Sequence, residues 1–225
     1  MKKRTKLKDR TLPNYTKGEE IANMVTHIIG GVIGIVALVL CVVFAAKNKN
    51  VYGIVSGSIF GAMMILLYTM SSIYHGLSPK LTAKKVFQII DHCTIFLLIA
   101  GTYTPIVLCA VREYSPALGW TLFGVIWGFA ILGIVLNSID LKKYKTFSMI
   151  CYLVMGWACI CICDKFTLIL GRTGTWLLVL GGVSYTIGAI LYGIGAKKKY
   201  YHTVFHVLVD IGSLLHFLCI LLYVM

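Results

Sequence analysis

Two histidines four residues apart, His202 and His206, have the spacing in this chain that most directly suggests metal chemistry. Residues four apart lie on the same face of an α-helix, so both imidazoles can reach one ion. His75 ends another apolar stretch and can supply a third nitrogen. Three histidines with one open position are typical of catalytic zinc, whereas structural zinc sites fill all four positions with protein ligands. The sequence therefore predicts a zinc ion on these three histidines.

Further polar residues in apolar stretches are candidates for supporting roles. Asp91 opens a predicted helix, and a carboxylate there could act as a base or orient a ligand or a water molecule. Ser71 lies one turn before the third histidine on the same helix face. Glu20, Asn23 and His27 form a stripe with spacing i, i+3, i+7. This stripe either closes the cytoplasmic mouth of the site or hydrogen-bonds the metal ligands. Alternatively, it only supports the helix start and bonds a neighbouring helix.

The other histidines and the cysteines are expected to serve the structure. A histidine near a membrane-helix end, taken alone, is more often interfacial or hydrogen-bonding than a ligand. His92 is expected to point to a different helix face from its neighbour Asp91 and to be interfacial. His216 lies about 15 Å along the helix axis from His206, too far to share an ion, and is expected to form an interhelical hydrogen bond. The cysteines at 159, 161 and 163 cannot converge on one ion, because residues two apart point to different helix faces.

The composition identifies the environment in which these residues work. Hydrophobic residues make up 59% of the 225 and charged residues 13%, with a mean hydropathy of +0.87. Soluble domains carry about 25% charged residues, so the chain is expected to be an integral membrane protein. The net charge of +13 does not indicate nucleic-acid binding, because Lys and Arg lie in short clusters between apolar runs. The expected partners are membrane lipids, including the anionic inner leaflet.

Seven apolar runs are suited to cross a bilayer as helices. They lie at 24–46, 51–75, 86–110, 117–139, 146–163, 174–196 and 203–225. Lys and Arg gather in a basic N-terminal tail, residues 1–22, and in the second, fourth and sixth connections. The positive-inside rule then places the N-terminus in the cytoplasm and the C-terminus outside. The predicted fold is an all-α membrane protein, with residues 23–225 forming a single seven-transmembrane helix bundle.

This topology brings the candidate site residues to one membrane depth. The first, third and seventh helices begin at the cytoplasmic face, and the second helix ends there. His75, Asp91, His202 and His206 are therefore expected near that face, although they are far apart in the sequence. Because ionisable residues in membrane spans are costly and usually functional, this convergence strengthens the prediction of a zinc site.

Three motifs, in this order, resemble the signature of the progestin and adiponectin receptor (PAQR) family. They are Glu20-x-x-Asn23-x-x-x-His27, Ser71-x-x-x-His75 with Asp91, and His202-x-x-x-His206. The stretches SSIYHG, DHCTIFLLIAGTYTP and FHVLVDIGSLLHF are similar to the bacterial branch, the hemolysin III proteins. The resemblance implies a seven-helix bundle in a bacterial plasma membrane, zinc on the three histidines, and Asp91 near the zinc-bound water.

Three functions are compatible with these observations. The first is a zinc-dependent hydrolase that cleaves a lipid amide with Asp91 as base and influences membrane lipid homeostasis, since the family resembled includes receptors with ceramidase-like activity. The second is a channel or pore-forming, cytolytic protein, as the hemolysin name suggests, although no predicted span carries the sustained polar stripe of a water-filled pore. The third is a non-enzymatic sensor or receptor for membrane lipid with structural zinc. An open zinc position beside a lipid-sized cavity would favour the hydrolase.

Overall fold

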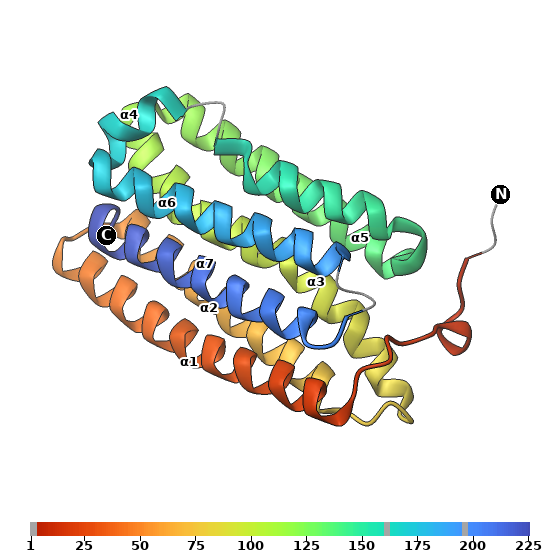
Figure 1. The fold of residues 1–225 in the computed structure, drawn as a ribbon. Helices are drawn as coiled ribbons and strands as arrows, with labels where there is room; N and C mark the ends of the chain where they lie inside the picture. Colours follow the sequence, from red (N-terminus) through yellow and green to blue (C-terminus); the bar gives the residue numbers. More distant parts are fainter. Residues whose placement is uncertain (1–3, 160–162, 195–197) are drawn as a thin grey trace.

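The computed structural model describes residues 4–159, 163–194 and 198–225 of the chain. These residues are helical almost throughout and contain no β-strand, which confirms the all-α class (Figure 1). The elements are a 3-10 turn η1 (Leu7–Asp9), α1 (Lys17–Lys47), α2 (Val51–Gly76), α3 (Thr82–Pro105), a π-helix η2 (Ile106–Val111), α4 (Arg112–Tyr114), α5 (Pro116–Gly156), α6 (Cys163–Ile194) and α7 (Tyr201–Tyr223).

Local sequence signals explain where the first two long helices begin. The Thr16 hydroxyl accepts from Glu19 N at 3.3 Å, and the Glu19 carboxylate accepts in return from Thr16 N at 2.9 Å. Such a reciprocal capping box satisfies backbone donors that have no partner inside the first turn. The first helix therefore begins at Lys17, within the predicted tail 1–22. Asn50 caps α2 similarly, by accepting from Gly53 N at 2.8 Å.

α5 is a hairpin of two helical arms. Asp140 has extended backbone angles (φ −159°, ψ 92°), and its carboxylate caps the second arm by accepting from the N–H groups of Lys142 and Lys143, both at 3.1 Å. Ser148 Oγ donates to Asn137 Oδ1 at 2.6 Å, although eleven residues of straight helix would separate the two by about 16 Å. The chain therefore doubles back at Asp140, as Figure 1 shows.

The helices overlap the predicted spans, with the following differences in their bounds. The arms of α5 cover 116–139 and 141–156, against the predicted 117–139 and 146–163. The predicted span 86–110 is divided between α3 and η2. α6 begins before the predicted 174, but Gly171 breaks it with a φ of +67°. Positions 160–162 and 195–196 of two predicted spans lie outside the described residues, as does the middle of the three clustered cysteines.

Among the described residues, six helices are long and apolar enough to cross a membrane, with α5 counted as one. The side chains of α1 are sorted for that environment. Asn23 and His27 face inward and are buried, whereas Ile29 and Val32 are 54% and 56% exposed. Polar residues inside and apolar residues outside suit a helix surrounded by lipid rather than water. The chain is thus a multi-span helical membrane protein.

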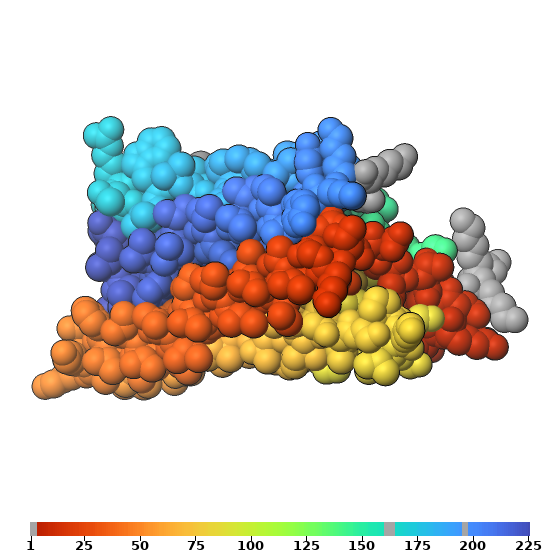
Figure 2. Space-filling view, turned by 60° about the horizontal axis from the view of Figure 1, so that its bottom comes forward, coloured from red at the N-terminus to blue at the C-terminus, as the bar shows by residue number. Residues whose placement is uncertain are grey.

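The packing of α1 fixes the region where the site residues lie. α1 packs along α2 and α7, and α6 packs along the other side of α7; α3 lies between α2 and α5. Figures 1 and 2 show α1, α7 and α6 side by side. α1 and α2 approach closely because Gly61 has no side chain: a Cβ there would lie 2.5 Å from Leu38 Cα. This antiparallel pair brings the start of α1 beside the end of α2.

Candidate metal centre

Three imidazoles meet between the last turn of α2 and the first turns of α7. The Nε2 atoms of His75 and His202 lie 3.3 Å apart, and those of His202 and His206 lie 3.0 Å apart. His75 and His206 are almost fully buried, and His202 is partly buried. One ring nitrogen of each lies within 4.8 Å of the other two, and within the described part of the chain no other set of three potential ligands meets in this way.

The spacing of these nitrogens fits a metal ion. Zinc binds imidazole nitrogen at about 2.0–2.1 Å in tetrahedral geometry, which separates two ligand nitrogens by roughly 3.3 Å. The two separations in the structure, 3.3 and 3.0 Å, are close to that value. The three histidines can therefore hold a metal ion with little movement of their side chains.

Groups behind two of the histidines direct their Nε2 lone pairs toward the centre. His75 Nδ1 donates to Glu20 Oε2 at 2.7 Å. His206 Nδ1 lies 3.2 Å from the carbonyl oxygen of Asn23 and 3.4 Å from Thr26 Oγ1. A neutral imidazole that donates from Nδ1 presents a lone pair at Nε2, as a metal ligand must. Hydrogen bonds of this kind orient metal-binding histidines and raise their basicity.

The polar stripe on α1 contacts both helices that carry the histidines. Asn23 is fully buried, and its Oδ1 accepts from Thr203 Oγ1 of α7 at 2.6 Å. Its Nδ2 lies 3.5 Å from Nδ1 of His75 in α2. One turn further along α1, the ring of His27 stacks on that of His206 with centroids 3.6 Å apart. The stripe thus joins α2 to α7 directly behind the three imidazoles.

A buried lysine, Lys84, extends this network and was not singled out in the sequence. Its Nζ lies 2.8 Å from Glu20 Oε1 and donates to the carbonyl oxygens of Tyr74 and Leu77, both at 2.9 Å. In the sequence it is one of several basic residues in the connection after the second apolar run. No spacing distinguishes it from its neighbour Lys85, so only the three-dimensional contacts identify it.

Tyr15, in the segment before α1, covers the outer side of the histidine cluster and was also missed. Its ring stacks on His202 with centroids 5.0 Å apart and an angle of 16°, and its centroid lies 6.0 Å from that of His75. Burial raises the pKa of Tyr15, so its hydroxyl stays neutral. Thr5 N donates to Asp140 Oδ2 at 2.7 Å, which ties the same segment to the turn of α5. The described part of the basic tail therefore packs against the bundle.

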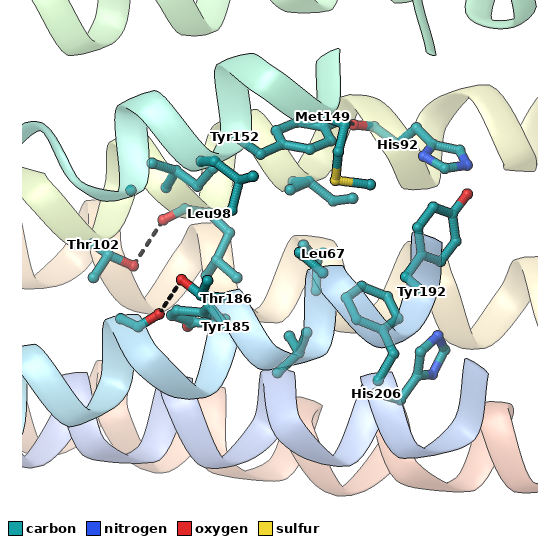
Figure 3. A pocket seen from close by; sticks show the side chains of 18 of the residues that line it. Leu67, His92, Leu98, Thr102, Met149, Tyr152, Tyr185, Thr186, Tyr192 and His206 are labelled. Carbon is teal, nitrogen blue, oxygen red and sulfur yellow. Dashed lines mark hydrogen bonds between the residues drawn. The ribbon is translucent and has the colours of Figure 1, made fainter. Parts of the chain in front are cut away.

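An elongated cavity of about 150 Å³ begins at the histidines and extends between α3, α5, α6 and α7 (Figure 3). His202 and His206 line one end and His216 lines the other. The fourteen residues from His202 to His216 correspond to about 21 Å along a helix axis. Most of the wall between these ends is apolar, and it includes Leu67, Ile95, Leu98, Ile99, Met149 and Leu153.

Three of the other predicted site residues line this cavity near its histidine end: Asp91, Ser71 and His27. The hydroxyl of Ser71 and both ring nitrogens of His27 are buried and have no hydrogen-bond partner among the described residues. A buried polar group without a partner is costly, so these atoms represent unused hydrogen-bonding capacity beside the cavity. Asp91 does not belong to the group of potential metal ligands in the described residues, but it borders the same space.

Two histidines that were not expected to belong to the site also lie along the cavity, His92 and His216. His216 Nε2 donates to the carbonyl oxygen of Leu178 in α6 at 3.0 Å, which confirms the expected interhelical hydrogen bond. The expectation that His92 points away to the membrane interface is wrong, because His92 lines the cavity together with Asp91 and meets Tyr192 with centroids 6.4 Å apart. Asp91 and His92 are adjacent, so their side chains differ in direction by about 100° around the helix. The cavity is wide enough for both side chains to line it.

The chain matches known proteins over nearly its whole length. A family model described as haemolysin-III related matches residues 15–217. The chain is 41% identical over 209 residues to a hemolysin-3 homolog of Bacillus subtilis (strain 168), covering 93% of this chain and 96% of the relative. It is 39% identical over 208 residues to hemolysin-3 of Bacillus cereus, covering 92% of each chain. The human monocyte to macrophage differentiation factor is 24% identical over 206 residues, 90% of this chain and 83% of that protein. These matches confirm the resemblance carried by the three motifs, and the chain belongs to the haemolysin-III-related family.

Proposed function

We propose that this chain is a zinc-dependent hydrolase of the bacterial plasma membrane that cleaves a lipid amide. One observation carries the proposal: three histidine nitrogens with the spacing of metal ligands lie at one end of a long apolar cavity inside a membrane protein. A catalytic zinc needs a position open to the substrate. A lipid substrate needs an apolar space that leads to that position, and the cavity has this form.

Seven membrane crossings, with the N-terminus in the cytoplasm and the C-terminus outside, are part of the proposal. The two arms of α5 count as separate crossings because the chain reverses between them at Asp140. Basic residues occupy the connections at the histidine end of the bundle, among them Lys80, Lys85, Lys143 and Lys198. The positive-inside rule assigns this end to the cytoplasm.

A zinc ion on the three histidines would supply a Lewis acid that lowers the pKa of water to about 7. The carboxylate of Asp91 would accept a proton as general base or orient the attacking water. The unpartnered atoms of Ser71 and His27 would hydrogen-bond the amide group of the substrate. The apolar walls would hold an acyl chain and keep bulk water from the reacting groups.

The distribution of polar groups in the cavity indicates the class of substrate. Asp91, Ser71 and His27 lie with the histidines at one end, and mainly apolar side chains follow. This arrangement suits an amphipathic lipid whose amide lies at the centre and whose chain extends inward, and it agrees with the resemblance to receptors with ceramidase-like activity. A pore, which the printed name of the Bacillus relatives suggests, would need a polar lining along its length, whereas this lining is mainly apolar.

Hydrolysis of ceramide, a lipid amide, by purified protein in vesicles tests the proposal. We expect the wild-type protein to release fatty acid, and Asp91→Asn to be slower by about 100-fold or more while keeping its zinc. Glu113→Gln, which removes an exposed carboxylate near the opposite end of the bundle, is the matched control and should keep full activity. If zinc-loaded wild-type protein releases no fatty acid from a panel of lipid amides, the hydrolase is excluded in favour of a lipid sensor.

A further inference from the structure

Lys84 lies in the first turn of α3 with only 1% of its surface exposed. Lysine is rarely buried, because its ammonium group loses favourable hydration when it leaves water. Burial is tolerated where other groups replace that water. The partners of Lys84 therefore indicate which part of the molecule its burial serves.

The ammonium group of Lys84 connects the end of α2 to the start of α1. It donates to the carbonyl oxygens of Tyr74 and Leu77, both at 2.9 Å, and lies 3.4 Å from the carbonyl oxygen of His75. Carbonyl groups at a helix end have no partner within the helix. The same ammonium group lies 4.9 Å from the centroid of the Tyr74 ring. Its charged partner is Glu20 Oε1 of α1, at 2.8 Å.

Glu20 extends this contact to a proposed metal ligand. Its second oxygen, Oε2, accepts from His75 Nδ1 at 2.7 Å. A carboxylate bonded through both oxygens is held in one orientation, and so is the imidazole that donates to it. The Glu20 side chain is 13% exposed. Without Lys84, its carboxylate could therefore turn toward water and release His75.

We propose that Lys84 is a positioning residue of the metal centre: by holding Glu20 against His75, it sets the affinity of the three histidines for their metal. This inference rests on the proposed metal centre and adds to it a residue from outside the three motifs. The alternative is a structural role in which Lys84 only caps α2 through the carbonyl contacts. The two roles differ because only the first depends on Glu20.

A zinc titration in competition with a chelator separates the two roles, with purified Lys84→Met, Glu20→Gln and the double variant. We expect each single variant to bind zinc about 10- to 100-fold more weakly than wild type, and the double variant to bind as weakly as Glu20→Gln alone. The matched control is Lys85→Met. The Lys85 ammonium is exposed and donates to the carbonyl oxygen of Lys8, so this variant should keep the wild-type affinity.

Two further measurements guard against a trivial loss of folding. Lys84→Gln keeps amide donors for the carbonyl groups but removes the charge that holds Glu20, so it should fold and still bind zinc more weakly. Thermal unfolding of the metal-free variants checks the fold, and the absorption spectrum of bound Co²⁺ reports the ligand geometry, which should change in Lys84→Gln.

Two results would overturn the role of Lys84 while leaving the metal centre in place. One is wild-type zinc affinity in Lys84→Gln. The other is a double variant in which the losses of Lys84→Met and Glu20→Gln add, because Lys84 would then act independently of Glu20. Wild-type protein that binds no zinc would instead overturn the metal centre itself, and the same titration distinguishes this result from the first two.

Discussion

The two sides of the bundle differ in how their helices meet. On one side, α1, α2 and α7 are joined by buried hydrogen bonds that converge on the histidines, such as Thr203 to Asn23 at 2.6 Å and His75 to Glu20 at 2.7 Å. On the other side, α3, α5 and α6 border a mainly apolar cavity, and α5 touches α6 over only a short stretch. The first side suits ligands that must be held in one geometry, and the second suits a flexible chain.

This difference suggests a division of function between the two sides of the bundle. Changes in the network that joins α1, α2 and α7, which includes Lys84 at the start of α3, should alter metal binding. Changes in the cavity wall should alter turnover of a lipid and leave the metal in place. Paired variants, one on each side or one facing inward and one outward, test this division.

Removal of a proposed ligand should have the largest effect. We expect His206→Ala to lose most of the zinc, about one ion per chain in the wild type, because two nitrogens hold an ion far less tightly than three. His216→Ala removes another buried histidine from the same helix and should keep its zinc. Metal analysis of the purified proteins checks this, and equal zinc in wild type and His206→Ala would refute the assignment of the ligand.

The second-largest effect is expected from a variant that fills the cavity, and it should be an effect on turnover alone. Ala189 of α6 lines the cavity, whereas its neighbour Ile190 is 52% exposed on the outer surface. We expect Ala189→Phe to slow lipid amide hydrolysis by about 100-fold, because a displaced substrate loses its alignment with the reacting groups. Zinc content should not change, and Ile190→Phe should behave as wild type. Full activity in Ala189→Phe would show that the substrate does not use this cavity.

Two fully buried asparagines, one on each side, allow the two sides to be compared by substitutions at equal burial. Asn23 accepts from Thr203 beside the histidines, and Asn137 accepts from Ser148 inside the α5 hairpin, both at 2.6 Å. Each change to Ala removes a fully buried amide and leaves a hydroxyl without its acceptor, so each should lower the free energy of unfolding by about 1–3 kcal/mol. Only Asn23→Ala should also weaken zinc binding, by about tenfold. Thermal unfolding in detergent together with a zinc titration measures both effects, and a similar loss of zinc affinity in Asn137→Ala would contradict the division.

The smallest effect is expected at the outer cover of the cluster. Tyr15 stacks on His202, and an aromatic contact of this kind is worth about 1 kcal/mol. Tyr15→Ala should therefore speed zinc dissociation by about fivefold, measured by transfer to a chelator in stopped flow. Tyr114→Ala, at an exposed position outside the cluster, should leave the rate unchanged. An unchanged rate in Tyr15→Ala would mean that the segment before α1 does not hold the site closed.

Helix periodicity and charge asymmetry account for what could be predicted of this fold and site. The spacing of His202 and His206 places both on one face of α7, and basic connections at alternate turns order the spans. Together they bring His75 to the same end of the bundle, where the structure also has it. The capping box at Thr16 and Glu19 was equally visible as a pattern, and it would have placed the start of α1 correctly.

Contacts among several helices account for what could not be predicted. Lys84 of α3 is buried because it contacts the end of α2 and Glu20 of α1. Both partners belong to other helices, so the sequence pattern of α3 does not indicate them. His92 was assigned to the interface because helix geometry separates it from Asp91, but the cavity that both border depends on how α3, α5 and α6 pack. Such features depend on how several helices pack together, and the residue pattern of a single helix does not specify that packing.

X-ray absorption at the zinc edge of the purified wild-type protein tests the metal centre most directly. We predict three imidazole nitrogens at about 2.0–2.1 Å and one oxygen donor. The imidazole signal should fall by one nitrogen in any His206→Ala protein that still holds zinc. Sulfur ligands at about 2.3 Å, or no bound zinc at all, would contradict the assignment of His75, His202 and His206.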